Sequence, residues 1–441
     1  MTEEIRVRFA PSPTGKVHIG NIRAAIYNWL YARHVGGKFL LRVEDTDLER
    51  STPEAIQALF DCMEWLGLGL GDEPVFYQTK NVKRHLEVVE RLLASGDAYK
   101  VERTSRDGKT GVVTMFRMPK EGTIEFDDIV KGHMAKKAED IPDFAIVRSD
   151  GSPIFHLANV VDDIDQRVTH IIRGDDHVEN TFKHICLFRA IGAPIPHYGH
   201  LSMIVNAQGK PYSKRDGAAF VGEFRDAGYL PEALFNYLLL LGWNPGDERE
   251  VLTREEMVSL FDLEKVHVTA AKFDLKKLQW MNGEYIKRLP RDEFKAAMRK
   301  SVEGLEGAAG RDEAWWDRLC DQMQVRMKFL KDMPGNIEYF FRDDYAFDPK
   351  AVEKRLAKDG VKATLLDLAD RFEKVATWDA VSLEVVVKEL SQGQGMGPWV
   401  HPVRVAVSGR TEGPGLFELL ELLGREHSLA RIRAAAAKYC P

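Results

Sequence analysis

The sequence predicts an α/β protein with a parallel sheet in its first half and an all-helical final third. Residues 5–43 have the pattern strand, helix, strand. Residues 95–141 are polar and rich in Lys, Glu and Gly, which indicates an insertion into that first fold. Beyond Arg291 nearly every apolar pattern has the period of a helix. A chain of 441 residues exceeds one ordinary hydrophobic core, so several domains are expected.

The first three elements form a βαβ unit. Ile5–Phe9 alternates between apolar and charged residues, as a half-buried strand does. Apolar residues then recur at helical spacing from Ile22 to Leu30, and Gly36 with Gly37 ends that helix. Phe39–Val43 is the second strand. Two strands joined by one helix predict a parallel pair with a right-handed crossover.

Later elements are predicted from the same periodicities. Val112–Phe116 is a short strand within the insertion, and the apolar pattern returns near Ile154. His170–Ile172 is another strand, and Pro231 suits the first turn of a helix that runs to Leu241. The final third should contain helices over Glu293–Val302, Trp315–Phe329, Val361–Phe372, Leu416–Leu423 and Ser428–Ala437.

Composition excludes several classes of protein. With 44% hydrophobic and 29% charged residues, the chain is neither disordered nor a membrane protein. Its longest apolar run, Tyr237–Leu241, is too short to span a bilayer, and Met1–Arg8 lacks the apolar stretch of a secretory signal. We therefore expect a cytoplasmic protein. The net charge of −6 gives no global sign of nucleic-acid binding, although local Lys and Arg suffice for that.

The four cysteines are expected to be free thiols. Cys62, Cys186, Cys320 and Cys440 are more than a hundred residues apart. No pair has the spacing of metal ligands, and a reducing cytosol disfavours disulfides.

A turn between the first strand and the first helix has the features of a phosphate site. Pro11–Gly15 reads Pro-Ser-Pro-Thr-Gly, and His18 and Gly20 precede the helix. Unpaired N–H groups at a helix N-terminus favour anions, and glycine lets a phosphate approach the backbone. His18 is placed to donate a hydrogen bond to a phosphate oxygen. A histidine near a turn is by itself more often an ordinary surface residue, so the neighbouring residues have to decide.

Those neighbours resemble a known family. His18-Ile-Gly-Asn21, preceded by Ala-Pro-Ser-Pro-Thr-Gly, resembles the "HIGH" element of class I aminoacyl-tRNA synthetases, and in particular their glutamyl and glutaminyl branch. Arg42-Val-Glu-Asp-Thr-Asp47 matches the next motif of that branch. The resemblance implies a Rossmann-like catalytic domain that binds ATP, with Gly15, His18 and Gly20 at the nucleotide.

A second pair of motifs is similar to the family's amino-acid pocket. Phe155–Asn159 leads into Val160–Asp163, and Ile171–His177 follows. The resemblance implies that Arg8 and Arg173 hold the acid groups of glutamate and that Glu44 receives its ammonium, with Ser12, Phe155 and Asn159 as further contacts. Guanidinium suits this role because it donates two parallel charge-assisted bonds to a carboxylate. Phe155 departs from the tyrosine that the family often has, so a hydroxyl contact is lost or supplied elsewhere.

Gly209–Gly217 resembles the second class I signature, "KMSKS", which in the glutamyl enzymes usually reads Lys-Leu-Ser-Lys-Arg. Pro211 and Tyr212 occupy its first two positions, while Ser213, Lys214 and Arg215 match. The resemblance assigns these three to ATP and makes His18 and Lys214 the catalytic residues. Negative charge grows on the phosphates as pyrophosphate leaves, so a lysine there stabilises the transition state. Pro211 removes one cation, which should weaken ATP binding.

The resemblance extends from Arg8 to Gly424 and is identified as that of a bacterial glutamyl-tRNA synthetase. It implies five parts: the first half of the catalytic domain at 1–80, an inserted acceptor-binding domain at 81–155, the second half at 156–225, a stem-contact domain at 226–290 and a helical anticodon-binding domain at 291–441. The expected substrates are ATP with Mg²⁺, L-glutamate and tRNA-Glu, with tRNA-Gln left open, and the expected state is a monomer. No protein metal ligand is assigned. Because residues 95–141 contain no cysteine and a single histidine, His133, we expect no zinc.

Alternative functions remain open at this point. A small-molecule adenylyl- or cytidylyltransferase explains His18 but not Glu44, Ser213 or Lys214. A glutamyl transferase acting on a modified tRNA base lacks the helical final third, and glutaminyl enzymes normally end in β-barrels. A catalytically inactive RNA-binding paralogue is disfavoured by the intact His18, Glu44, Arg173 and Lys214.

Overall fold

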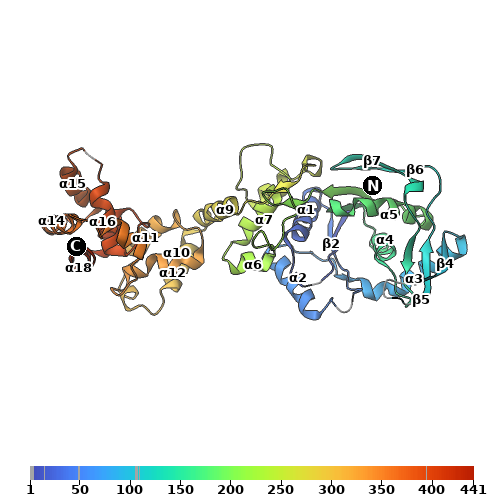
Figure 1. Ribbon diagram of the computed structural model, residues 1–441, viewed down its shortest axis with the longest axis horizontal. Helices are drawn as coiled ribbons and strands as arrows, with labels where there is room; N and C mark the ends of the chain where they lie inside the picture. The colour runs from blue at the N-terminus through green and yellow to red at the C-terminus, as the bar shows by residue number, and fades with distance from the viewer. Residues whose placement is uncertain (1–3, 14, 48–49, 105–107, 109, 394) are drawn as a thin grey trace. The chain divides into compact units, whose positions relative to one another are not determined.

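The computed structural model describes residues 4–13, 15–47, 50–104, 108, 110–393 and 395–441 (Figure 1). Thr14 of the predicted phosphate turn and residues 105–107 and 109 of the predicted insertion lie outside the described residues. The chain forms two compact units, Met1–Leu278 and Gln279–Pro441. The finer division into five parts stays a prediction.

The predicted βαβ unit is confirmed. Strand β1 (Arg6–Phe9) pairs in parallel with β2 (Lys38–Val43), and helix α1 (Ile19–Val35) connects them. His18 caps α1, and Gly36 ends it with a φ of 67°, a left-handed conformation that glycine adopts without strain. Helix α1 packs against β1, β2 and β9 (His170–Gly174).

A seven-stranded sheet forms the centre of the first unit, in the order β3-β2-β1-β9-β10-β6-β7. Strands β3 (Phe76–Tyr77), β2, β1, β9 and β10 (His197–Leu201) are parallel neighbours, and β6 (Thr123–Asp128) pairs in parallel with β10. Strand β7 (Gly132–Lys137) completes an antiparallel hairpin with β6. Two strands of the predicted insertion thus extend the catalytic sheet.

The rest of the insertion packs on the same core. Helix α3 (Val82–Ser95) precedes a three-stranded antiparallel sheet of β4 (Ala98–Thr104), β5 (Thr110–Phe116) and β8 (Phe144–Val147). One hydrophobic cluster joins Val88, Phe116 and Ile146 of this segment to Leu40 of β2 and Ile171 of β9. The insertion and the parallel sheet therefore share their buried surface.

The remaining helices of the first unit begin and end as follows: α2 (Pro53–Trp65), α4 (Phe155–Asp165), α5 (Val178–Ile191), α6 (Val221–Asp226), α7 (Pro231–Leu240) and α8 (Arg254–Leu260). Two short strands, β11 (Ile204–Val205) and β12 (Ala271–Lys272), pair in parallel. Helix α9 (Leu275–Arg288) contains the boundary between the two units.

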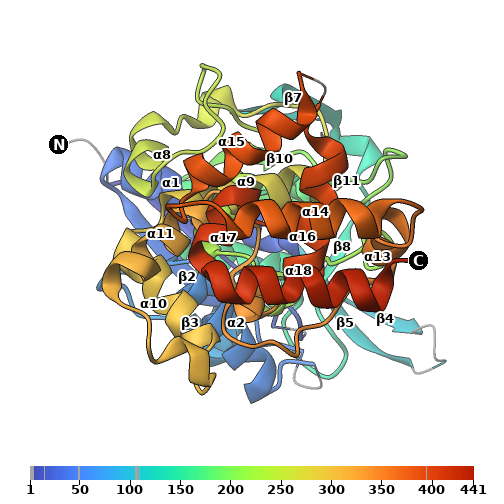
Figure 2. The same cartoon turned by 90° about the vertical axis from the view of Figure 1, so that its left-hand side faces the viewer.

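The second unit is helical, as predicted (Figure 2). Its helices are α10 (Arg291–Ser301), α11 (Glu313–Gln324), α12 (Met333–Ile337), α13 (Pro349–Arg355), α14 (Val361–Glu373), α15 (Ala380–Ser391), α16 (Gly397–Ser408), α17 (Leu416–Leu423) and α18 (Arg425–Tyr439). Helices α14, α16 and α18 pack against one another. The helix predicted over Trp315–Phe329 is too long, because α11 ends at Gln324 and Phe329 is extended.

All four cysteines are buried and unpaired. No helix among the described residues is long and apolar enough to cross a membrane.

Candidate active site

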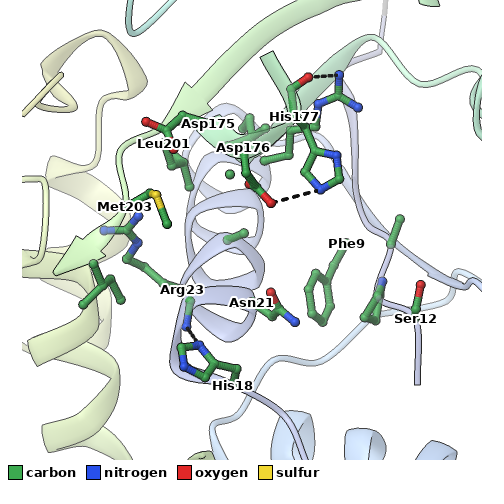
Figure 3. Close-up of a pocket in the computed structure, with 18 of the residues that line it drawn as sticks. Phe9, Ser12, His18, Asn21, Arg23, Asp175, Asp176, His177, Leu201 and Met203 are labelled. Atoms are coloured by element: carbon green, nitrogen blue, oxygen red, sulfur yellow. Dashed lines mark hydrogen bonds and ion pairs between the residues drawn. The ribbon is translucent and has the colours of Figure 1, made fainter. Parts of the chain in front are cut away.

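A cavity of about 620 Å³ opens where the parallel strands end (Figure 3). Its walls include the residues at or just beyond the carboxyl ends of β1, β2, β9 and β10, which is where open α/β sheets bind their ligands. Eight of the residues predicted for the site line it: Arg8, Ser12, His18, Gly20, Glu44, Phe155, Asn159 and Arg173. Gly15, Ser213, Lys214 and Arg215 are not among its lining residues, although Pro211 and Tyr212 are.

His18 is held as a neutral hydrogen-bond donor. The Gly20 N–H donates to its Nδ1 at 3.0 Å, so the ring proton is on Nε2. Burial lowers the pKa of His18, outweighing the opposing effect of a hydrogen bond to the Tyr212 backbone. The imidazole is therefore uncharged at neutral pH. It lies at the N-terminal end of α1, on the opposite side of the view from Asp176 and His177 (Figure 3).

Backbone pairing brings the two signature segments together. Ile19 N donates to Ala219 O and Val221 N donates to Val17 O, both at 3.0 Å, on either side of an antiparallel bridge between His18 and Phe220. The Phe220 ring lies 5.7 Å from the His18 ring and 4.8 Å from Lys214 Nζ. The imidazole and the ammonium, nearly two hundred residues apart in sequence, thus contact the same aromatic ring.

A compact turn carries Lys214. The Asp216 carboxylate accepts hydrogen bonds from Ser213 N at 2.9 Å, Ser213 Oγ at 3.0 Å and Asn206 Nδ2 at 2.7 Å. These bonds place the pKa of the Asp216 carboxyl below its usual range. Upstream, Tyr212 N donates to Ile204 O, and the buried Tyr212 ring packs on Phe273 with centroids 4.5 Å apart.

Beneath the cavity, two buried arginines share one carboxylate. Asp163 Oδ1 accepts from Arg8 Nε at 3.1 Å and from Arg42 Nη1 at 2.6 Å. Burial alone raises the pKa of Asp163, but Arg42 and Arg8 outweigh it and the carboxyl's pKa lies below its usual range. Arg8 Nη1 and Nη2 have no partner among the described residues, so both remain for a ligand in the cavity that Arg8 lines.

Glu44 is held beside these arginines. Its Oε1 accepts from Asn159 Nδ2 at 2.7 Å and from Arg42 Nη2 at 3.4 Å. Burial raises the pKa of Glu44, against the opposing pull of Arg42 and Arg8. A buried carboxylate of this kind gains by receiving a cation from the cavity.

Arg173 is oriented by three protein acceptors. Its Nε donates to His200 Nε2 at 3.2 Å, and its Nη2 donates to Thr181 Oγ1 at 2.7 Å and to His177 O at 3.2 Å. Burial lowers the pKa of Arg173 to about 10, so the group stays charged at neutral pH. Among the described residues Nη1 has no partner.

Phe155 lies in a group of rings at the cavity wall. Its ring is 5.9 Å from that of His177 and 5.8 Å from that of His184. The His156 and His184 nitrogens approach to 3.2 Å, and burial lowers the pKa of His156 to about 4. The wall around Phe155 is therefore aromatic and uncharged.

The described residues contain no group of three or more His, Cys, Asp or Glu that could hold a metal ion. The cavity is lined by two guanidinium groups, one carboxylate and a neutral imidazole, and Lys214 contacts the same Phe220 ring as that imidazole. Such a site fits a zwitterionic acid at the guanidinium groups and a polyanion near the imidazole and the lysine.

Comparison with known families agrees with this geometry. The family model described as "tRNA synthetases class I (E and Q), catalytic domain" matches residues 4–108 and 101–280. The chain belongs to this family. A second family model, "Anticodon binding domain", matches residues 285–436, which lie in the helical unit.

Similar proteins span the whole chain. A glutamate–tRNA ligase of Francisella philomiragia is 39% identical, with 99% of each chain covered. Glutamate–tRNA ligase 1 of Caldanaerobacter subterraneus is 36% identical over 99% of this chain and 98% of its own. A crystal structure of a glutamate tRNA ligase from Elizabethkingia meningosepticum, in complex with its amino acid, superposes with a TM-score of 0.86 at 28% identity and covers 99% of this chain and 100% of that one.

Several residues of this class I synthetase site could not be assigned from sequence. His177 lines the cavity, whereas its place at the end of the Ile171–His177 motif indicates no role for it. Arg42 and Asp163 also lie in recognised motifs, and only the fold shows that they pair. His200 and Asp128 lie outside every recognised motif, so no sequence signal pointed to them.

Proposed function

We propose that the protein is a glutamate–tRNA ligase, which activates L-glutamate with ATP and transfers it to the 3′ end of tRNA-Glu. One observation carries the proposal: Arg8 and Arg173 line a cavity together with Glu44, and each has guanidinium nitrogens without a partner in the part of the chain that the structure describes. Glutamate has two carboxylates and one ammonium, and this set of groups complements all three. Full-length similarity to glutamate–tRNA ligases supports the same conclusion.

Activation needs no protein nucleophile. The glutamate α-carboxylate, already ionised, attacks the α-phosphorus of ATP, an O–P bond forms, and pyrophosphate leaves with the bonding electrons. His18 Nε2–H, which faces the Tyr212 backbone in the structure, donates instead to a phosphate oxygen when ATP binds, and Lys214 approaches the phosphates as their charge grows. Charge stabilisation of this kind acts mainly in the transition state. Mg²⁺ accompanies ATP and needs few protein ligands, because phosphates and water provide most of its coordination.

The residues assigned to each substrate are part of the proposal. Gly15, His18, Gly20, Ser213, Lys214 and Arg215 bind ATP; Arg8, Ser12, Glu44, Phe155, Asn159 and Arg173 bind glutamate. The contact that Phe220 makes with both His18 and Lys214 supports a shared nucleotide site. As an enzyme of protein synthesis the protein works in the cytoplasm, as a monomer and without zinc.

Charging of two purified tRNAs, measured separately, tests the proposal. With Mg-ATP and glutamate, tRNA-Glu should be charged. Equal charging of tRNA-Gln indicates a non-discriminating enzyme, and charging of tRNA-Gln alone indicates an enzyme that feeds amidation. Failure to charge either tRNA contradicts ligase function and favours an inactive RNA-binding paralogue. Glutamate that remains on an internal tRNA fragment after nuclease removal of the 3′-terminal adenosine identifies the base-modifying alternative.

A further inference from the structure

Three buried polar side chains form a row behind the amino-acid pocket. Asp128 ends β6, His200 lies in β10 and Arg173 lies in β9, and these strands are neighbours in the sheet. His200 and Arg173 are direct partners in the register of β10 and β9. Their exposed fractions are 3% for Asp128, 0% for His200 and 7% for Arg173. Burial of this kind is costly unless each group is hydrogen-bonded.

The direction of each hydrogen bond is fixed by chemistry. Arg173 Nε can only donate, so His200 Nε2, at 3.2 Å, accepts with its lone pair. His200 Nδ1 therefore has the proton and donates to Asp128 Oδ2 at 2.6 Å. A protonated His200 would turn an N–H toward the Arg173 N–H. Thr181 Oγ1 also lies 3.1 Å from His200 Nε2, and its hydroxyl can donate to the same lone pair. The neutral ring with its proton on Nδ1 therefore suits all three neighbours.

Asp128 is itself held rigidly. Its Oδ1 accepts from the backbone N–H groups of Val130 at 3.0 Å, Lys131 at 2.9 Å and His200 at 3.2 Å. Burial raises the pKa of Asp128, but the His200 and backbone hydrogen bonds outweigh it, so the carboxyl's pKa lies below its usual range. The carboxylate is a fixed acceptor at the end of the row.

We propose that Asp128 and His200 are positioning residues that orient the Arg173 guanidinium toward the glutamate substrate. This rests on the proposed function and deepens it. With Nε engaged by His200 and Nη2 by Thr181 and the His177 carbonyl, Nη1 is the nitrogen of Arg173 that is left for the ligand. Since Asp128 belongs to the inserted segment at 81–155, recognition of the amino acid depends on a residue of that segment.

Asp128→Asn tests the proposal. The asparagine Oδ1 is still needed by three backbone N–H groups, so its NH₂ group takes the place of Oδ2 and faces His200 Nδ1. That amide can only donate, so the ring proton moves to Nε2, where it opposes Arg173 Nε and competes with Arg173 Nη2 for Thr181 Oγ1. The measurement is tRNA charging at saturating tRNA. KM for glutamate should rise about tenfold, because a change of this size corresponds to the loss of one hydrogen bond to a charged group. KM for ATP should stay nearly constant.

Asp127→Asn is the matched control. It makes the same chemical change one residue earlier in β6, at a side chain that is 90% exposed and contacts only His133 among the described residues. Its KM for glutamate should equal that of the wild type. A purely structural role for Asp128 lowers the active fraction, and hence kcat, and leaves KM for glutamate unchanged, which is the result that overturns the proposal.

A second pair of variants tests the proposal independently in case Asp128→Asn folds poorly. His200→Gln retains an acceptor for Arg173, whereas His200→Leu does not, so KM for glutamate should rise much more in the leucine variant. Equal KM values in these two variants also overturn the proposal. If the wild-type protein charges no tRNA with glutamate, the proposed ligase function is wrong. Failure of the ligase function is thus distinguishable from failure of the positioning role, which only the variants test.

Discussion

In the proposed mechanism, His18 and Lys214 act on phosphates in different ways. His18 is fixed by the Gly20 N–H and presents a neutral Nε2–H, whereas Lys214 is exposed on a turn and touches the site through the Phe220 ring. A fixed donor binds the ground state and the transition state, while a lysine that approaches late favours the transition state. Both residues were identified from their motifs, because each motif combines several residue types at set spacing.

Removing either side chain should lower charging sharply. We expect His18→Ala and Lys214→Ala each to reduce kcat/KM by about 10²-fold, the usual loss for one preorganised charge-stabilising contact. Thermal unfolding should change little for Lys214→Ala because that side chain is exposed. Lys265→Ala, an exposed lysine paired with Asp262, serves as the control. Near-normal turnover in either site variant removes that residue from the mechanism.

Asp163 shows what motif recognition cannot reveal. The motif that contains it was recognised, but its partners Arg8 and Arg42 are 155 and 121 residues away. A single sequence contains no information on which buried charges meet. The same holds for His200 and Asp128, which are 72 residues apart.

Asp163→Asn should lower the free energy of unfolding and make that free energy depend less on pH in the acid range. The folded-state pKa of Asp163 is depressed, so its stabilisation is fully present above the unfolded pKa of about 3.9 and is lost as pH falls through the lower folded pKa. At pH 7 the variant leaves the buried Arg42 with one fewer negative charge beside it. The free energy of unfolding should therefore fall by about 3–5 kcal/mol. Calorimetric unfolding of the first unit from pH 7 to 3 measures this. Identical acid dependence in variant and wild type contradicts the assignment.

Elements with local start and stop signals were predicted accurately. Gly36 ends α1, Pro231 begins α7, and α17 has the predicted bounds of Leu416–Leu423. The error at α11 has a physical reason: Met327 remains buried beyond the helix end, so the apolar spacing continues although the helix does not. The joining of β6 to β10 could not be predicted, because only tertiary packing decides which strands pair.

The turn that carries Lys214 depends on Asp216. Asp216→Ala removes the acceptor for Ser213 N, Ser213 Oγ and Asn206 Nδ2, so Lys214 should occupy more positions and kcat should fall about tenfold. Charging kinetics at saturating glutamate measure this. The control is Asp226→Ala, an exposed aspartate paired with its neighbour Arg225. Unchanged kcat in Asp216→Ala means that the turn does not need this acceptor.

The whole molecule divides where the two family models meet. The compact units part between Leu278 and Gln279, and the catalytic and anticodon models match up to residue 280 and from residue 285. Strands β6 and β7 of the predicted insertion extend the sheet of the first unit, and its buried residues join the core of that unit. Composition indicates a polar segment of different character at 95–141, but it does not show which hydrophobic core that segment shares.

Deleting residues 292–441 should separate the binding of ATP and glutamate from the charging of tRNA. The remaining fragment retains the entire cavity and should still bind ATP and glutamate, as calorimetry can show. Charging of tRNA-Glu should fall by about 10²-fold or more, because unpaired anticodon bases are read by separate protein contacts. A fragment that charges tRNA at the full-length rate assigns recognition to the first unit alone.

The pairing of Val17–Ile19 with Ala219–Val221 limits how the proposed ATP site can open. Tyr212 is anchored on Phe273 at one end, and Ala219 is bonded to Ile19 at the other, so only residues 213–218 are left to swing. Gly217, with a φ of 138°, is the natural pivot within that short span. Lys214 therefore belongs to a short segment that is anchored at both ends, and in the proposed nucleotide site it can move only as far as these six residues allow.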